Sequence, residues 1–175
     1  LVDADYSSSA EHFNCNYLLD SALPNIDFGQ VTANLESYRN NIRLNSTSDK
    51  NINKLRDIVY EDCKKGAKHE PGVFTLTAPT GSGKTLALLK FALEHAIEYH
   101  KERIIIVLPF LSIIEQNAAQ YKDICNYILE AHSSVEYTGK NPALAKELSS
   151  RWAANIIITT SVCFFETLFR NSPAD

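Results

Sequence analysis

The spacing of hydrophobic and polar positions changes near residue 50. Residues 1–50 are rich in Ser and Asn, which predicts turns and linkers without a compact core, apart from an amphipathic stretch at 31–42 expected to be helical. Apolar side chains then recur at helical spacing over 50–63, and Asp49 is suited to cap that helix. The pattern therefore places the start of a folded domain near residue 49.

Short apolar runs alternate with helical segments in the rest of the chain. Each run is rich in β-branched residues and reads as a buried strand, at 73–78, 104–108 and 156–160. Helices are expected over 84–101, 112–129, 143–153 and 161–170. Strands that alternate with helices predict βαβ units with right-handed crossovers around a parallel sheet. The expected fold class is therefore α/β.

Composition narrows the class of protein. The 175 residues are 45% hydrophobic and 22% charged, as in ordinary globular domains, and no apolar run reaches the roughly 18 residues that span a bilayer. The net charge of -4 gives no global basic field, although a local groove can still bind a nucleic-acid backbone. Four widely spaced cysteines favour reduced thiols and a cytoplasmic location. Without a long apolar run, no membrane partner is expected. The absence of Met, with Leu at position 1, indicates a piece of a longer protein, the alternative being a processed mature chain.

The sharpest chemical signal is the segment Ala78-Pro79-Thr80-Gly81-Ser82-Gly83-Lys84-Thr85, between a predicted strand and a predicted helix. It matches the phosphate-binding loop G-x-x-x-x-G-K-[ST], with Ala at the first glycine position. Glycines let the backbone approach a phosphate, and the N–H groups and helix dipole attract the anion. The predicted cofactor-binding residues are Pro79, Thr80, Gly81, Ser82, Gly83, Lys84 and Thr85.

Within this loop, Lys84 and Thr85 are the predicted catalytic residues. Lys84 is expected to reach the β- and γ-phosphates of a nucleotide, and the Thr85 hydroxyl to bind Mg²⁺. A glycine-rich turn that binds nothing is the alternative, which Gly-Lys-Thr at this spacing disfavours. The loop alone does not predict hydrolysis, because no Asp-Glu pair follows strand 156–160 to hold magnesium and activate water.

Further segments at 91–96, 103–117 and 159–169 carry recognisable motifs, and Asn53 and Arg56 precede the loop. Together with the loop they resemble the CRISPR-associated nuclease-helicases of type I systems, within superfamily 2 helicases, over residues 51–170. The resemblance implies a RecA-like domain, ATP and Mg²⁺ as cofactors, and Asn53 and Arg56 as nucleotide-binding residues.

The same resemblance implies an HD-type nuclease domain before two RecA-like domains. Residues 1–48 would be the C-terminal remnant of the nuclease domain with a linker, and residues 49–175 part of the first RecA-like domain. Segment 1–6 is similar to the last metal-bearing segment of the nuclease, which implies Asp5 as a ligand of a divalent transition metal. No His-Asp pair supplies the other ligands, so nuclease activity is not expected of this fragment.

Loops after strands 104–108 and 156–160 are expected on the ligand side of the sheet. Hydroxyl and N–H groups there can hold nucleic-acid phosphates without reading sequence. The predicted contacts with single-stranded DNA are Pro109, Ser112, Gln116, Thr159 and Thr160. Helix capping by Ser112 and Ser161 is the alternative role, and the two roles are compatible.

The resemblance implies an enzyme that a guide-RNA surveillance complex recruits to target DNA in antiviral defence. It would translocate along the displaced strand with ATP and degrade that strand. The fragment alone is expected to be inactive, because the acidic motif and the second domain with its arginine finger are missing. Two alternatives remain open: the ATP-binding domain of another superfamily 2 translocase or RNA helicase, and a catalytically inactive nucleotide-binding fragment.

Overall fold

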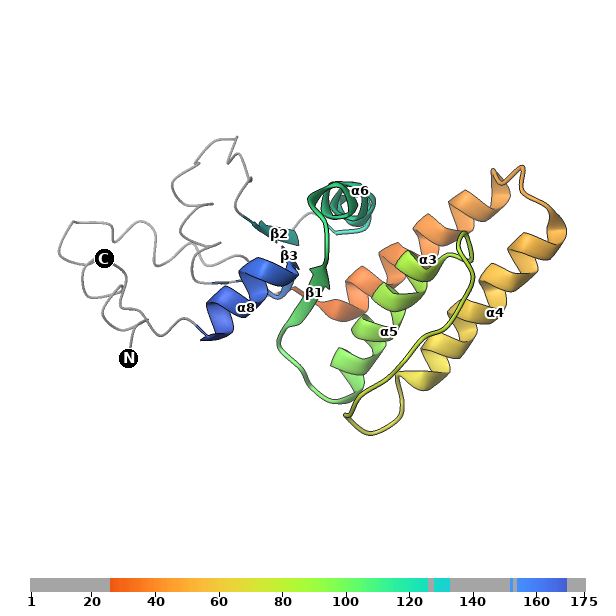
Figure 1. Cartoon of the computed structure of the whole chain (residues 1–175). Coiled ribbons are helices and arrows are strands. Elements are labelled where there is room, and N and C mark those ends of the chain that lie inside the picture. The colour runs from red at the N-terminus through yellow and green to blue at the C-terminus, as the bar shows by residue number, and fades with distance from the viewer. Residues whose placement is uncertain (1–25, 126–127, 133–151, 153, 170–175) are drawn as a thin grey trace. The chain divides into compact units, whose positions relative to one another are not determined.

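A computed structural model describes residues 26–125, 128–132, 152 and 154–169 (Figure 1). They fall into two compact units, a helical unit (26–104 and 120–125) and a sheet unit (105–119, 128–132, 152 and 154–169), which we describe separately. The boundary between them falls inside one strand and one helix. Asp5 and most of the helix predicted at 143–153 lie outside the described residues.

Three helices make up most of the helical unit: α3 (Phe28–Leu44), α4 (Lys50–Gly66) and α5 (Lys84–Glu98). The predicted cap of α4 is confirmed, since the Asp49 carboxylate accepts a hydrogen bond from the Asn51 backbone N–H at 2.9 Å. Helices α3 and α4 each pack against α5. Val31 and Leu35 of α3 are buried, so the expectation that residues 1–50 contribute to no core is wrong for this helix.

The segment before the phosphate loop departs from the prediction of a buried strand at 73–78. It forms no strand in the structure, and Val73 is 97% exposed. Alternate side chains of this segment still face the helices. Leu76 and Ala78 pack on the core of α4 and α5, and the centre of the Phe74 ring lies 5.0 Å from that of Phe91. Side-chain pattern alone does not make a strand, because a strand also needs a neighbour for its backbone hydrogen bonds.

The sheet unit contains β1 (Ile104–Leu108), β2 (Ile128–Ala131) and β3 (Ile156–Thr160), in the order β1-β3-β2. Strands β2 and β3 pair in parallel, with Ile128 opposite Ile156. Helix α6 (Leu111–Lys122) follows β1, and α8 (Ser161–Phe169) follows β3 and contacts it. The predicted α/β fold class is confirmed.

Two predictions about this unit are wrong in detail. The helix expected over 112–129 ends at Lys122, because residues 128–131 form β2 and pair with β3. Strand β1 is not fully buried, since Ile105 and Val107 are exposed. The strand at 156–160 is confirmed as buried, with Ile156, Ile157 and Ile158 inaccessible to solvent.

Candidate nucleotide-binding site

The segment before α5 forms a tight turn at two glycines. Gly81 has φ +80° and Gly83 has φ +78°, values in the left-handed region that glycine adopts without steric cost. The Ser82 N–H donates to the Pro79 carbonyl at 3.3 Å and closes the turn. Gly83 then occupies the N-cap position of α5, where it offers no side-chain hydrogen bond.

The N-terminus of α5 therefore carries partial positive charge that no side chain caps. The N–H groups of a first helical turn have no partner inside the helix, and the helix dipole adds to their potential. The Lys84 ammonium adds a full charge beside them, where it donates to the carbonyls of Ala78 and Pro79, both at 2.8 Å. This arrangement suits an anionic ligand with several oxygen atoms.

Ser82 gives a second indication of a polar ligand. Its side chain is 1% exposed, and within the described part of the chain its hydroxyl has no hydrogen-bond partner. A buried hydroxyl without a partner carries a desolvation cost, which a ligand oxygen within its reach would offset. Pro79 and Thr80, which are also predicted to bind the cofactor, are exposed.

Thr85 lies in the first turn of α5, next to Lys84. Its carbonyl accepts a hydrogen bond from the Tyr121 hydroxyl at 3.2 Å, which ties this turn to the residue 120–125 segment of the helical unit. Among the described residues, no cluster of His, Cys, Asp and Glu could hold a metal ion by itself. In this turn a magnesium ion bound with a nucleotide would find the Thr85 hydroxyl as a ligand beside phosphate oxygens and water, which fits its chemistry.

Asn53 and Arg56, on α4, are brought to the phosphate loop. The Arg56 Nε donates to the Gly81 carbonyl at 3.0 Å. Its Nη1 donates to Asn53 Oδ1 and to Ser48 Oγ, both at 3.3 Å, and Ser46 Oγ donates to the same Asn53 oxygen at 3.3 Å. The structure thus joins the loop, α4 and the α3–α4 connection in one polar network.

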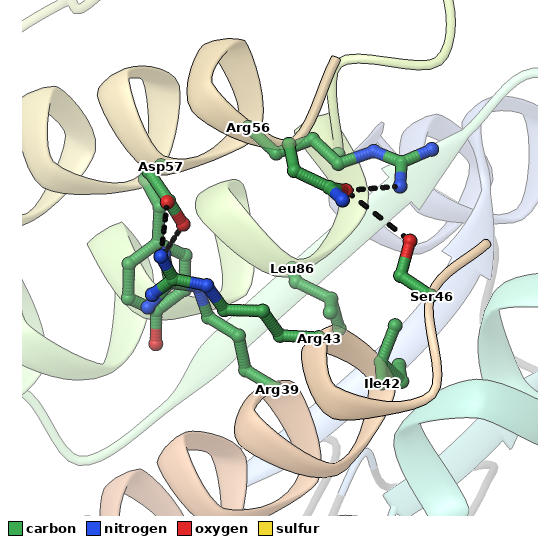
Figure 2. A pocket seen from close by; sticks show the side chains of 10 residues that line it. Arg39, Ile42, Arg43, Ser46, Arg56, Asp57 and Leu86 are labelled. Carbon is green, nitrogen blue, oxygen red and sulfur yellow. Dashed lines mark hydrogen bonds and ion pairs between the residues drawn. The ribbon is translucent and has the colours of Figure 1, made fainter. Parts of the chain in front are cut away.

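A pocket opens beside this network, inside the helical unit. Figure 2 shows side chains from α3 and α4 around it, with Leu86 of α5. Its lining consists of Arg39, Ile42, Arg43, Ser46, Asn53, Arg56, Asp57, Tyr60, Gly83 and Leu86. The sequence pattern did not predict that α3 lines a pocket. The available signal was a pair of basic residues four positions apart, at 39 and 43, which lie on one face of a helix.

A buried ion cluster, also missed from the sequence, fixes α3 to α5. The Lys90 side chain is 2% exposed, and its Nζ lies 2.8 Å from Glu36 and 2.7 Å from Glu94. Burial alone would lower the pKa of Lys90, but the two carboxylates outweigh it and raise that pKa. Burial likewise opposes the charge of Glu36, yet Lys90 lowers the Glu36 pKa. The only sequence signal was an acidic residue four positions after a lysine in an apolar helix.

Arginines on the same face of α3 as Glu36 fix this helix to α4. Arg39 pairs with Asp57, and its guanidinium lies 4.1 Å from the centre of the Tyr60 ring. Arg43 reaches the second oxygen of Asp57 at 3.1 Å, as Figure 2 shows. The Tyr60 hydroxyl donates to Glu36 at 3.1 Å and connects this group to the Lys90 cluster. All three helices around the phosphate loop are thus linked by charged side chains.

The residues predicted to contact DNA belong to the sheet unit. Pro109, Ser112 and Gln116 are exposed at the end of β1 and along α6, which begins at Leu111, so Ser112 is not its N-cap.

The two threonines at the end of β3 differ. Thr159 is fully buried and its hydroxyl donates to the Ala131 carbonyl, and its contact with DNA stays a prediction. The Thr160 hydroxyl accepts from the Cys163 N–H at 3.1 Å, which caps α8 in place of the predicted Ser161.

Comparison with known proteins places the loop in a family. A family model described as DEAD/DEAH box helicase matches residues 49–173, which include the phosphate loop and the whole described sheet. No curated protein matches the chain. No helix in the described ranges combines the length and apolar character needed to cross a membrane. Because the family match covers most of the chain, the chain belongs to the DEAD/DEAH box helicases, ATP hydrolases that use ATP with Mg²⁺ and bind nucleic acid.

Proposed function

We propose that the chain is the ATP-binding part of a motor that translocates along single-stranded DNA in CRISPR antiviral defence, within a protein that also degrades the strand. The observation that carries the ATP-binding part is the uncapped N-terminus of α5 beside Lys84 and two left-handed glycines. Membership of the helicase family supports coupling of ATP hydrolysis to nucleic acid. The CRISPR role rests on the joint resemblance of segments 91–96, 103–117 and 159–169.

Three side chains of the loop have distinct roles in this proposal. Lys84 exchanges its two carbonyl partners for β- and γ-phosphate oxygens, and the N–H groups of the first turn of α5 donate to the same phosphates. The Thr85 hydroxyl holds Mg²⁺, and the Ser82 hydroxyl gains the partner that it lacks within the chain. ATP bound with Mg²⁺ supplies the phosphoanhydride bond that drives translocation.

The proposed DNA contacts are Pro109, Ser112 and Gln116, with Thr160 limited to its main chain because its hydroxyl caps α8. The exposed position of Ser112 in the first turn of α6 supports this assignment, since hydroxyl groups near helix N-termini can hold phosphates. Sequence resemblance alone supports the remaining parts of the proposal. These are a nuclease remnant at 1–48 with Asp5 on a divalent transition metal, and a guide-RNA surveillance complex as partner. The assignment of residues 49–175 to part of a first RecA-like domain is supported in addition by the family match over residues 49–173.

Binding of labelled oligonucleotides tests the nucleic-acid part. We expect the chain to bind single-stranded DNA more tightly than RNA of the same sequence when Mg·ATP is present, with affinity that falls as salt increases. Gln116→Ala should weaken DNA binding, whereas Asn40→Ala, on the exposed surface of α3, should not. Binding of RNA alone would reject this proposal and favour an RNA helicase.

A further inference from the structure

We infer that Arg56 is a positioning residue that shapes the phosphate loop through the Gly81 carbonyl and does not act by touching the nucleotide. The inference rests on the proposed function, namely that this loop binds a triphosphate. It differs from the role that the sequence resemblance implied, in which Arg56 itself binds the cofactor.

The Arg56 side chain runs along the phosphate loop. A Cβ atom at Gly83 would lie 3.5 Å from Arg56 Cγ and 3.8 Å from Arg56 Cβ, so the arginine stem runs beside this glycine. Its Nε then reaches the Gly81 carbonyl at 3.0 Å. The Arg56 side chain therefore packs against Gly83 and donates a hydrogen bond to Gly81, the two glycines with φ in the left-handed region.

The contact between Arg56 and the Gly81 carbonyl fixes the orientation of one peptide group in the loop. The Gly81 carbonyl and the Ser82 N–H belong to one planar peptide group. Arg56 holds the carbonyl end of that plane, and the Pro79 carbonyl holds its N–H end at 3.3 Å. Glycine is the residue with the greatest backbone freedom, so without the Arg56 contact this peptide can turn and misalign the loop.

The Arg56 guanidinium is itself held in place by polar partners. Its Nη1 donates to Ser48 Oγ and Asn53 Oδ1, and the Ser48 N–H donates to Ser46 Oγ at 3.2 Å. The connection between α3 and α4 thus orients Arg56. Nε and Nη1 both have protein partners, which is the pattern of a residue that supports a binding loop.

Two substitutions separate this role from direct contact with the nucleotide. Arg56→Gln places an amide nitrogen at the same number of bonds from the backbone as Nε, so it keeps a donor for Gly81 and loses the charge. Arg56→Met has similar length and no donor. The measurement is the Kd of each variant for Mg·ATP and for inorganic tripolyphosphate, which lacks a base and a ribose.

We expect Arg56→Met to weaken both probes by about tenfold, the loss of one charge-assisted hydrogen bond, and Arg56→Gln to stay within about threefold of wild type. Equal losses in the two variants would overturn the inference, because they would show a need for charge at the phosphates. A loss for Mg·ATP alone would also overturn it, because it would show contact with the base or ribose.

The same titrations separate failure of this inference from failure of the proposed function. Wild-type protein that binds neither probe would refute both. Wild-type binding that both variants retain would refute the positioning role alone. Thermal melts of the two variants control for folding: both lose the same Nη1 contacts, and each should still unfold in one cooperative transition above the temperature of the titrations.

Discussion

The buried cation at Lys90 gives the most quantitative prediction. Replacing Lys90 with Met keeps an unbranched apolar stem one atom shorter and removes the charge, which leaves Glu36 and Glu94 without the ammonium at 2.8 and 2.7 Å. Removing one partner from a buried ion pair costs about 3–5 kcal/mol. The two carboxylates are 35% and 25% exposed, so water can partly replace the lysine. We therefore expect a loss near the lower end, about 3 kcal/mol in the free energy of unfolding.

Urea unfolding followed by far-UV circular dichroism measures this loss. In a thermal melt, each kcal/mol of lost stability lowers the melting temperature of a chain of this size by about 2–4 °C. The melting temperature of Lys90→Met should therefore fall by about 6–12 °C. The matched control is the triple variant Glu36→Gln, Lys90→Met, Glu94→Gln, which removes every charge of the cluster and should recover most of the stability. The reasoning is refuted if Lys90→Met unfolds like wild type, or if the triple variant is as unstable as the single one.

Three further predictions concern the same helical unit. The pKa of Glu36 is lowered in the folded protein, so its contribution to stability is present above the ordinary carboxyl pKa and is lost as pH falls through the folded pKa. In urea titrations, wild type should therefore lose more stability than Glu36→Gln between about pH 5 and about pH 3. Gly83→Ala should cost about 1–2 kcal/mol and weaken Mg·ATP binding in calorimetry, because its φ is +78°, whereas Gly72→Ala, which meets only Glu70 O at 3.8 Å, should do neither. Asp49→Ala should lower the free energy of unfolding by about 1 kcal/mol through loss of the α4 cap, measured in thermal melts. An unchanged melting temperature would contradict that role.

Local signals accounted for much of the fold. The start of α4 follows from a capping aspartate before a helical pattern, and β3 follows from a run of β-branched residues. The loop residues share a tight turn because the motif itself prescribes glycines with φ above zero at 81 and 83. Asn53 and Arg56 lie beside that turn, although the sequence did not indicate that they bind each other.

Features that depend on distant partners were missed. The four residues of β2, Ile-Leu-Glu-Ala, suit a helix as well as a strand, and pairing with β3 decides between them. Segment 73–78 has strand composition, but among the described residues it has no strand beside it. Burial of Lys90 depends in part on Glu36 of α3, and no local pattern links these two residues.

The central claim is that the N-terminus of α5 and Lys84 bind a triphosphate. Calorimetric titration of Mg·ATP into wild type, Lys84→Ala and Lys101→Ala tests it most directly, since Lys101 is an exposed lysine outside the loop. The account predicts saturable binding in wild type and Lys101→Ala, and an affinity at least about tenfold weaker in Lys84→Ala. Equal affinity in all three proteins would contradict it.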